Sequence, residues 1–274
     1  MTTRTAETLG PQTHGFPHLR RPPITEVVCG FFFSPIPTLD VFEFGVYWDS
    51  RRDDYPDKQM RLGLLDGASL DLSSRAWLIS RDDGPLLQQL QTDRFYVNWR
   101  RRGEDSYPHF SDREGRRGLR SLALTEFELF SEFCATRPTI GIRPDVERIE
   151  LTKVDSFERK LHWSNIDELE QLLPITRSFT DRRRTDQITL SLSEREQLPS
   201  GWLKVQINSS NDEQGRLTAI RLESRASLAV ESKERLTEAF ERANTRLNEV
   251  FFRLVPKAQE RFGIEESRSN DDLA

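Results

Sequence analysis

DQITLSLSEREQLPSGWLKVQINSSNDEQGRLTAIRLESRASL, residues 186–228, contains three segments in which apolar and polar side chains alternate. The apolar positions are Ile188, Leu190 and Leu192, then Leu203, Val205 and Ile207, then Ile220 and Leu222. Strict alternation is typical of strands with one buried face, and turn residues separate the segments, as in Asn211–Gly215. The pattern predicts a three-stranded antiparallel meander.

A long amphipathic helix is predicted to follow the meander, from about Ser232 to Phe262. Its apolar positions recur at alternating steps of four and three residues, at Leu236, Phe240, Ala243, Leu247, Val250 and Leu254. This spacing predicts a helix with one apolar stripe, which Pro256 is expected to kink. We expect the helix to lie across the meander. The same spacing is also a coiled-coil heptad pattern, so a homodimer through this helix is an alternative.

The first half of the chain alternates between strand and helix patterns. Buried strands are expected at Val27–Phe33 and around Ile149–Leu151, and two further strands on either side of the turn Asp82–Pro85. Apolar residues at helical spacing predict a short helix that Asp40 caps and a second helix over about residues 114–134. The expected order in this half is β-α-β-β-α-β.

Together these patterns predict an α+β protein built from two mainly antiparallel sheet-and-helix units. The N-terminal unit spans residues 21–156. The C-terminal unit, in which the long helix packs on the meander, spans residues 157–264. Residues 1–20 and 265–274 are polar, which is typical of a flexible leader and a flexible tail.

The segment around residues 86–102 changes the phase of its apolar pattern. Leu86 and Leu90 share one side of an ideal strand, whereas Phe95 and Trp99 fall on the opposite parity, so the phase flips near Thr92-Asp93. Either a β-bulge or a tight turn restores the pattern. We predict the bulge, because Thr-Asp lacks the glycine that two-residue hairpin turns favour.

The composition is that of a globular protein with a charged surface. The 17 phenylalanines and 5 tryptophans among 274 residues argue against a disordered chain. A net charge of −5 argues against a dedicated nucleic-acid binder, which usually carries a basic surplus. Cys29 and Cys134 have apolar neighbours and are expected to be buried, reduced thiols. Because no signal peptide and no apolar run near ~20 residues is present, we expect a cytoplasmic protein.

The candidate binding residues gather at the end of the segment that carries the phase change. They are Arg94, Asn98, Trp99, Arg100, Arg101 and Arg102, with a second arginine triplet at Arg182, Arg183 and Arg184. A basic strand end with an aromatic residue is typical of surfaces that stack on RNA or DNA. The competing interpretation places Trp99 in the core and the arginines in a solvated loop, where Glu104 and Asp105 offset their charge. Arg94 and Asn98 also fit a structural hydrogen-bond network.

A magnesium-dependent nuclease is a more distant alternative. Asp145, Glu158 and Lys160 occur in the order D…E-x-K, in which carboxylates bind Mg²⁺ and the lysine assists a water molecule. Such a string is common by chance in a highly charged chain. The sequence contains no phosphate-binding glycine motif, no nucleophile elbow and no Cys-x-x-Cys pair. We therefore predict no catalytic residue, no metal site and no cofactor.

Three blocks of the sequence carry a family resemblance: PPITEVVCG near the start, QLQTDRFYVNWR in the middle, and the SYP that follows. They resemble a sporadically distributed family of bacterial proteins of a little over 250 residues. The resemblance extends from Arg21 to about Ile264. It implies a bacterial cytoplasmic protein whose gene comes and goes between strains, as is typical of accessory systems such as defence islands. The family has no assigned catalytic residues to carry over.

The leading functional hypothesis is therefore a non-enzymatic binding or protein-interaction module, acting with a protein partner in a defence or mobile-element system. The alternative is a nucleic-acid-binding protein that uses the arginine clusters. An interaction module predicts an exposed apolar patch away from the arginines.

Overall fold

The computed structural model describes residues 15–62, 74–103, 107–113, 115–178, 189–196, 201–230 and 236–265. The strands are β1 (Ile24–Phe33), β2 (Asp57–Leu62), β3 (Ser74–Ile79), β4 (Leu86–Leu90), β5 (Arg94–Arg100), β6 (Val146–Glu158), β7 (Thr189–Glu196), β8 (Gly201–Asn211) and β9 (Leu217–Ala229). The helices are α1 (Val41–Ser50), α2 (Leu119–Thr136), α3 (Ile166–Leu172), α4 (Leu236–Leu254) and α5 (Ala258–Phe262). The protein therefore has the predicted α+β class.

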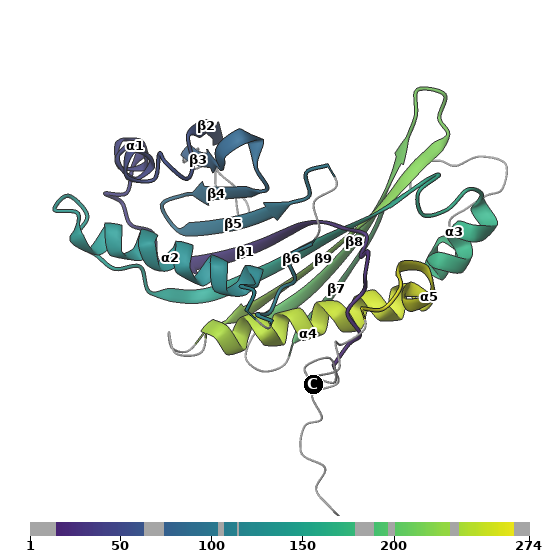
Figure 1. The fold of residues 1–274 in the computed structure, drawn as a ribbon. Coiled ribbons are helices and arrows are strands. Elements are labelled where there is room, and N and C mark those ends of the chain that lie inside the picture. Colours follow the sequence, from purple (N-terminus) through teal and green to yellow (C-terminus); the bar gives the residue numbers. More distant parts are fainter. Residues whose placement is uncertain are drawn as a thin grey trace, which may run out of the picture.

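The nine strands of the described residues belong to one antiparallel sheet in the order β2-β3-β4-β5-β1-β6-β9-β8-β7 (Figure 1). The predicted meander is present as β7, β8 and β9. It is joined to the first half of the chain by β6, which pairs with β1 along one edge and with β9 along the other. The predicted boundary between residues 156 and 157 lies inside β6, so both predicted units share this single sheet.

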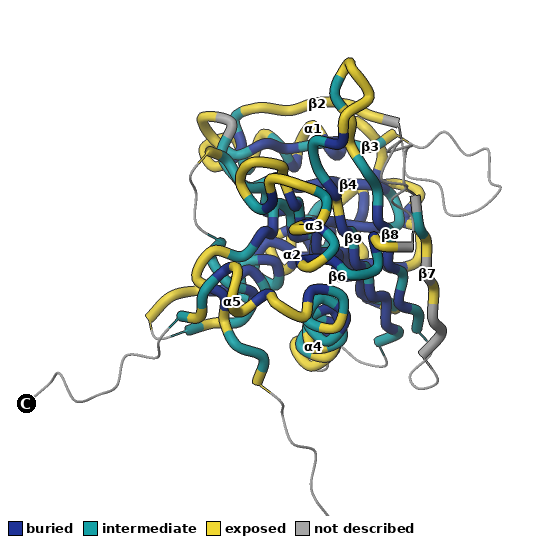
Figure 2. The backbone as a smooth tube through the Cα atoms, turned by 90° about the vertical axis from the view of Figure 1, so that its right-hand side faces the viewer, coloured by how far each residue is buried: buried dark blue, intermediate teal, exposed yellow. Residues whose placement is uncertain are grey.

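The helices α1, α2 and α4 pack on one face of the sheet, and the apolar core lies between this face and these helices. α2 packs on β1 and β5, and α4 packs on β6 and β9. Phe31 of β1 marks the centre of this layer, because its ring stacks on Phe127 of α2 at 4.3 Å and meets the edge of Phe240 of α4 at 5.3 Å. Figure 2 shows the buried backbone concentrated in the sheet and on the inner sides of the helices.

The first helix and the C-terminal helical segment lie where the sequence pattern predicts them. Asp40 caps α1, since its carboxylate accepts hydrogen bonds from the backbone N–H of Phe42 and Glu43. At the other end, the long predicted helix is divided near Pro256 into α4 and α5. The apolar stripe of α4 is buried against β6 and β9, so the side chains that a coiled-coil seam would use are already covered within this chain.

The segment from Leu86 to Arg100 is a tight hairpin, and the predicted β-bulge is wrong. β4 and β5 pair with each other, with Leu90 opposite Phe95 and Leu86 opposite Trp99. The turn closes where the backbone N–H of Gln91 donates to the carbonyl of Arg94 at 3.0 Å. The Arg94 guanidinium forms two hydrogen bonds to the Asp93 carboxylate, at 2.9 and 2.7 Å. This bidentate pair stabilises a turn without the glycine on which the prediction relied.

In the part of the chain that the structure describes, none of the helices combines the length and the apolar character that crossing a membrane requires.

Candidate functional site

The predicted arginine cluster separates onto two sides of the sheet. Successive residues of a strand face opposite ways, so Arg100 and Arg101 diverge. Arg100 lies near the ring of Trp77, at 6.0 Å, where Arg61 and Arg75 also pack. Arg101 turns the other way and donates from Nη2 to the carbonyl oxygen of Pro22 at 2.8 Å. Arg102 is half-buried just beyond the strand. The second triplet, Arg182 to Arg184, lies outside the described residues.

The other predicted binding residues of β5 have partners within the protein. Trp99 is buried in the core and packs against Tyr107 at 5.5 Å. Asn98 is buried on the opposite face, where it accepts from Gln89 and donates to Glu26, both at 2.8 Å. Arg94 is buried beside Asp93 and over the Phe32 ring. Of the predicted cluster, Arg101 is the residue that lines a cleft.

The residues of the nuclease hypothesis are far apart. Asp145 directly precedes β6 and Glu158 ends it, and β6 has 13 residues. An extended strand rises about 3.3 Å per residue, so the two positions are separated by roughly 40 Å. Among the described residues, no group of three His, Cys, Asp or Glu side chains is close enough to hold a metal ion.

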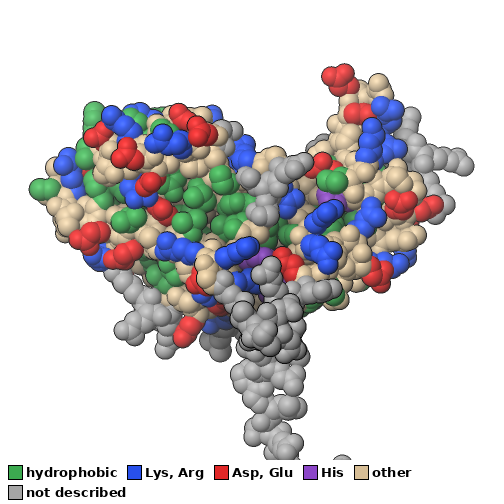
Figure 3. Space-filling view, in the orientation of Figure 1, with side chains coloured by type: hydrophobic (Ala, Val, Ile, Leu, Met, Phe, Trp, Pro, Cys, Tyr) green, Lys and Arg blue, Asp and Glu red, His purple; other side chains and the backbone are tan. Residues whose placement is uncertain are grey.

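A basic cleft of about 870 Å³ opens beside the helix layer, where the N-terminal segment crosses the end of the chain. Its walls carry four arginines, Arg20, Arg21, Arg101 and Arg261, and two histidines, His109 and His162. Glu265 is the one acidic side chain among the described residues of its wall. Figure 3 shows basic side chains and histidines together near the middle of this view of the molecule.

Short strand-like pairing holds these arginines in place. Leu19 forms an antiparallel bridge with Ile264, and the backbone N–H groups of Arg20 and Arg21 donate to the carbonyls of Gly263 and Phe262, both at 3.1 Å. Gly263 has φ +68°, a left-handed conformation that glycine adopts at little cost. The turn at Gly263 therefore brings Arg261 of α5 and the two leading arginines onto the same cleft.

Among the described residues, ion pairs leave the arginines of the cleft unneutralised. Within the described ranges, no carboxylate lies within ion-pair distance of Arg20, Arg21, Arg101 or Arg261. Three of these arginines donate to carbonyl oxygens instead: Arg20 to Ile264 at 3.5 Å, Arg101 to Pro22 at 2.8 Å, and Arg261 to His162 at 2.5 Å. Glu265 is already engaged, because it pairs with Arg113 at 2.5 Å and with His109 at 3.3 Å.

The electrostatics of His162 reflect this excess of positive charge. Burial, as the largest cause, and the nearby Arg261 and Arg101 guanidinium groups together lower the pKa of His162 to about 4. His162 is therefore neutral at neutral pH. Burial also lowers the pKa of Arg101, against the opposing pull of Asp155 and Glu158 at longer range. An anion entering the cleft meets guanidinium groups that form no ion pair with a carboxylate of the described residues.

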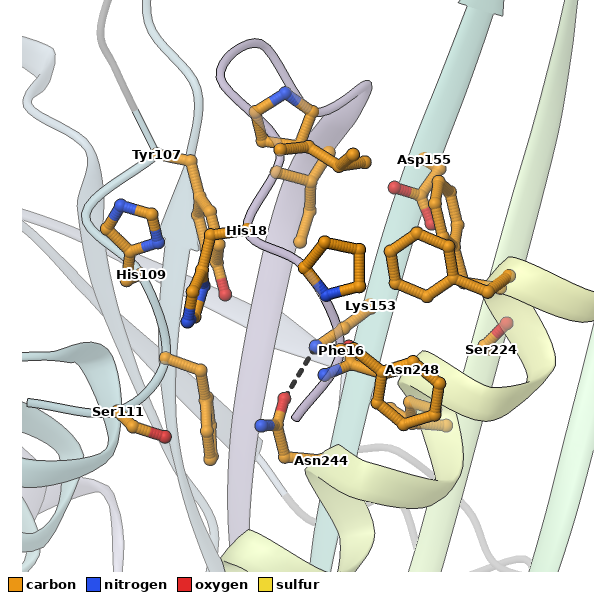
Figure 4. Close-up of a pocket in the computed structure, with 18 residues that line it drawn as sticks. Phe16, His18, Tyr107, His109, Ser111, Lys153, Asp155, Ser224, Asn244 and Asn248 are labelled. Carbon is orange, nitrogen blue, oxygen red and sulfur yellow. Dashed lines mark hydrogen bonds between the residues drawn. The ribbon is translucent and has the colours of Figure 1, made fainter. Parts of the chain in front are cut away.

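A smaller chamber of about 110 Å³ adjoins the cleft and shares the walls formed by Leu19, Pro22, Tyr107 and His109. Its floor is the helix-facing side of β6 and β9, where Lys153 stands directly opposite Ser224. α4 closes it from the other side. Figure 4 shows Lys153 near the centre of the chamber, with Tyr107, His18 and His109 on one side and Asp155 and Ser224 on the other.

Lys153 is a buried amine held in a fixed position. Its Nζ donates to the side-chain oxygens of Asn244 at 2.6 Å and Asn248 at 2.7 Å, which lie one turn apart on α4. Burial lowers the pKa of Lys153 to about 8, although Asp155 and Glu241 oppose this shift. Burial likewise raises the pKa of Asp155 to about 7, against the attraction of Lys153 and Arg101.

Two hydroxyl groups of the chamber have no hydrogen-bond partner among the described residues. They are Tyr107 Oη and Ser224 Oγ, and both atoms are buried. Buried polar groups in folded proteins are nearly always paired with protein, water or ligand. The chamber thus offers unused hydrogen-bonding capacity next to a basic cleft.

Two histidines, His18 and His109, line the chamber, and His109 also lines the cleft. The rings of His18 and His109 meet edge-to-face at 5.3 Å. Burial is the first cause that lowers the pKa of each, and Arg113 adds to it in both cases. Both are therefore neutral at neutral pH and present an imidazole that donates with one nitrogen and accepts with the other.

Comparison of the chain with protein-family models and with curated proteins finds no match. The resemblance to the bacterial family therefore stays a prediction.

Apart from Arg101, the residues that line the cleft and the chamber lie outside the predicted binding cluster. Lys153 and Asp155 lie in the strand pattern ELTKVDSF, and both charges fall on the parity of Ile149 and Leu151, which is the apolar side. Charged residues on the buried side of a strand are rare unless paired or functional, so this parity is the signal that could have found them. Nothing local in the sequence marks Arg20, Arg21 and Arg261 as neighbours.

Proposed function

We propose that this protein is a non-enzymatic binding protein whose basic cleft holds a small anionic molecule. The observation that carries the proposal is the set of four arginines, Arg20, Arg21, Arg101 and Arg261, that share one cleft and have no carboxylate partner among the residues that the structure describes. Arginines elsewhere in the described chain commonly form ion pairs, as Arg51 does with Glu126 and Arg137 with Glu43. In a chain of net charge −5, such a cluster is a local exception.

The chemistry of the cleft favours phosphate or carboxylate groups. Guanidinium groups match both geometrically and bind them through charge-assisted hydrogen bonds. The volume of about 870 Å³ lies within the range of small-molecule sites, which supports a small ligand over a long polymer. Both cysteines are buried and free, which supports a place in the reducing cytoplasm.

The test is a calorimetric titration with inorganic phosphate at low salt. Arg20→Gln and Arg21→Gln together remove two exposed guanidinium groups, so we expect the Kd to rise roughly tenfold, which corresponds to about 1.4 kcal/mol. The matched control is Arg242→Gln with Arg253→Gln, because both are exposed on α4 and make the same change in net charge. Binding that falls equally in both pairs of variants contradicts a specific site.

Nucleic acid is the competing outcome of the same experiment. A single-stranded oligonucleotide that binds with a steep salt dependence, while inorganic phosphate does not bind at all, would replace the proposal with the nucleic-acid alternative. In that case Arg100→Ala, beside Trp77, and Arg101→Ala, in the cleft, would identify which side of the sheet is used.

A protein partner is a second candidate function, and exposed apolar residues on α1 favour it. Phe42 is 79% exposed, Val41 42% and Val46 37%. Gly45 lies among them, with nothing within 4 Å of where a Cβ would stand. These residues form an apolar helix face away from the arginine cleft, as an interaction module predicts. The link to bacterial accessory systems rests on the resemblance alone.

The partner hypothesis is tested by affinity capture from a bacterial lysate with three proteins: the wild type, Phe42→Asp and the control Met60→Asp. Met60 is 52% exposed on β2. A partner that the wild type and the Met60 variant retain, and the Phe42 variant loses, supports docking on α1. Equal capture by all three contradicts it.

A further inference from the structure

The chamber beside the basic cleft has a polar floor with unused hydrogen-bonding capacity. Lys153 commits two of its three N–H donors to Asn244 and Asn248, which leaves one donor when it is protonated. Ser224 is 2% exposed and its hydroxyl has no partner among the described residues. The Tyr107 hydroxyl is buried and likewise without a partner there. These groups come from β6, β9 and the loop after β5, so three separate parts of the fold converge on one space.

Asp155 completes the floor. It is 5% exposed, lines the chamber, and accepts no hydrogen bond from any residue in the described part of the chain. A carboxyl group in this setting needs a partner that donates. Together, the chamber presents one free donor (Lys153), an acceptor (Asp155) and two hydroxyls that can both donate and accept.

The walls of the chamber are aromatic. Phe16 stacks on Phe252 of α4 at 5.4 Å with the rings nearly parallel. Phe110 lies against the amine of Lys153, whose Nζ is 5.9 Å from the ring centre. Apolar walls around a few convergent polar groups are typical of small-molecule sites. A head group that fits must carry hydroxyls toward the floor and C–H surface toward the rings.

We propose that the chamber is a subsite for the polyhydroxylated part of the ligand whose anionic group lies in the basic cleft. The ligand class is thus a sugar or polyol that bears a phosphate or a carboxylate. This inference rests on the proposed function, because the cleft supplies the anion site. A water-sized group needs about 10–15 Å³, so a chamber of about 110 Å³ has room for a head group of several heavy atoms.

The experiment compares four ligands by calorimetry: inorganic phosphate, butyl phosphate, glucose 6-phosphate and glucuronate. Butyl phosphate joins a phosphate group to an alkyl chain that has no hydroxyls. Its affinity therefore measures what the cleft contributes when only an apolar group can enter the chamber. We expect glucose 6-phosphate or glucuronate to bind at least tenfold more tightly than butyl phosphate, because only these can pair with the groups of the floor. Which of the two binds more tightly tells whether the anion is phosphate or carboxylate.

Two conservative variants test the floor itself. Ser224→Ala and Tyr107→Phe each remove one hydroxyl and nothing else. We expect each variant to reduce the preference for the sugar ligand over butyl phosphate at least threefold. The affinity of each variant for inorganic phosphate should stay within twofold of the wild type. Tyr47→Phe is the matched control, since the Tyr47 hydroxyl is also buried without a described partner but lies on α1. Its ligand preference should equal that of the wild type.

The outcomes separate the two proposals. Binding of inorganic phosphate without any preference for the hydroxylated ligands overturns the subsite and leaves the anion cleft in place. A preference that survives in both Ser224→Ala and Tyr107→Phe also overturns it. Failure of every anion, inorganic phosphate included, to bind at low salt overturns the proposed function.

Discussion

Asp155→Asn is the perturbation that most directly probes the electrostatics of the chamber. Burial raises the pKa of Asp155 from 3.8 to about 7. The folded protein therefore keeps a proton on Asp155 at pH values where the unfolded chain has already lost it. Between about pH 4 and pH 7 the folded state binds more protons, so the free energy of unfolding contributed by Asp155 falls as pH rises.

The magnitude follows from the size of the shift. Each pKa unit is worth about 1.4 kcal/mol, and the part of the shift that is expressed between pH 5 and pH 8 is about two units. Asparagine has nearly the same shape and does not titrate. We expect Asp155→Asn to stabilise the protein by about 2–3 kcal/mol more at pH 8 than at pH 5, relative to the wild type.

The assay is urea unfolding followed by tryptophan fluorescence at the two pH values. The control is Asp57→Asn, because Asp57 is exposed on β2 and its substitution should change stability equally at both. If Asp155→Asn changes the free energy of unfolding by the same amount at pH 5 and at pH 8, that result would contradict the burial of Asp155 in a chamber where no side chain of the described residues donates to it.

Three further predictions concern the fold. Phe240→Ala should lower the free energy of unfolding by about 3–5 kcal/mol, because the fully buried ring packs against Phe31 at the centre of the core; chemical denaturation measures this, and a loss below about 1 kcal/mol would contradict that packing. Asp40→Ala should cost about 1 kcal/mol by the same method, since it removes the cap of α1, whereas an unchanged midpoint would show that the cap does not contribute. Cys29 should react with a thiol reagent only after unfolding, because burial raises its pKa to about 12; rapid labelling of the folded protein at pH 8 would contradict its placement.

The sequence predicts those strands and helices whose apolar residues recur at a regular spacing within a single element. The alternation in β8 and β9 and the four-three spacing of α4 each arise within one element, and both are present in the structure. The pairing of β1 with β6 joins residues more than 100 positions apart, and no local pattern specifies it. At Thr92-Asp93, turn statistics favoured a bulge, whereas the Arg94–Asp93 pair stabilises a hairpin turn.

The candidate site was harder to predict than the fold, for a physical reason. Arg100 and Arg101 are adjacent in sequence, but strand geometry sends them to opposite sides, so the apparent cluster divides. Arg20 and Arg261 are far apart in sequence, yet the bridge between Leu19 and Ile264 brings them to one cleft. When tertiary contacts bring charged residues together, the sequence contains no continuous run of charged residues that would reveal the cluster.

The most direct test of the anion cleft is a crystal soaked in sodium tungstate, a heavy analogue of phosphate and sulfate, and measured at the tungsten absorption edge. We expect an anomalous peak in the cleft, within hydrogen-bond distance of guanidinium groups from Arg20, Arg21 or Arg261. The same soak of the Arg20→Gln, Arg21→Gln variant should lose that peak. Peaks confined to other surfaces, or a cleft that stays empty while tungstate occupies exposed arginines elsewhere, would contradict the proposed anion site.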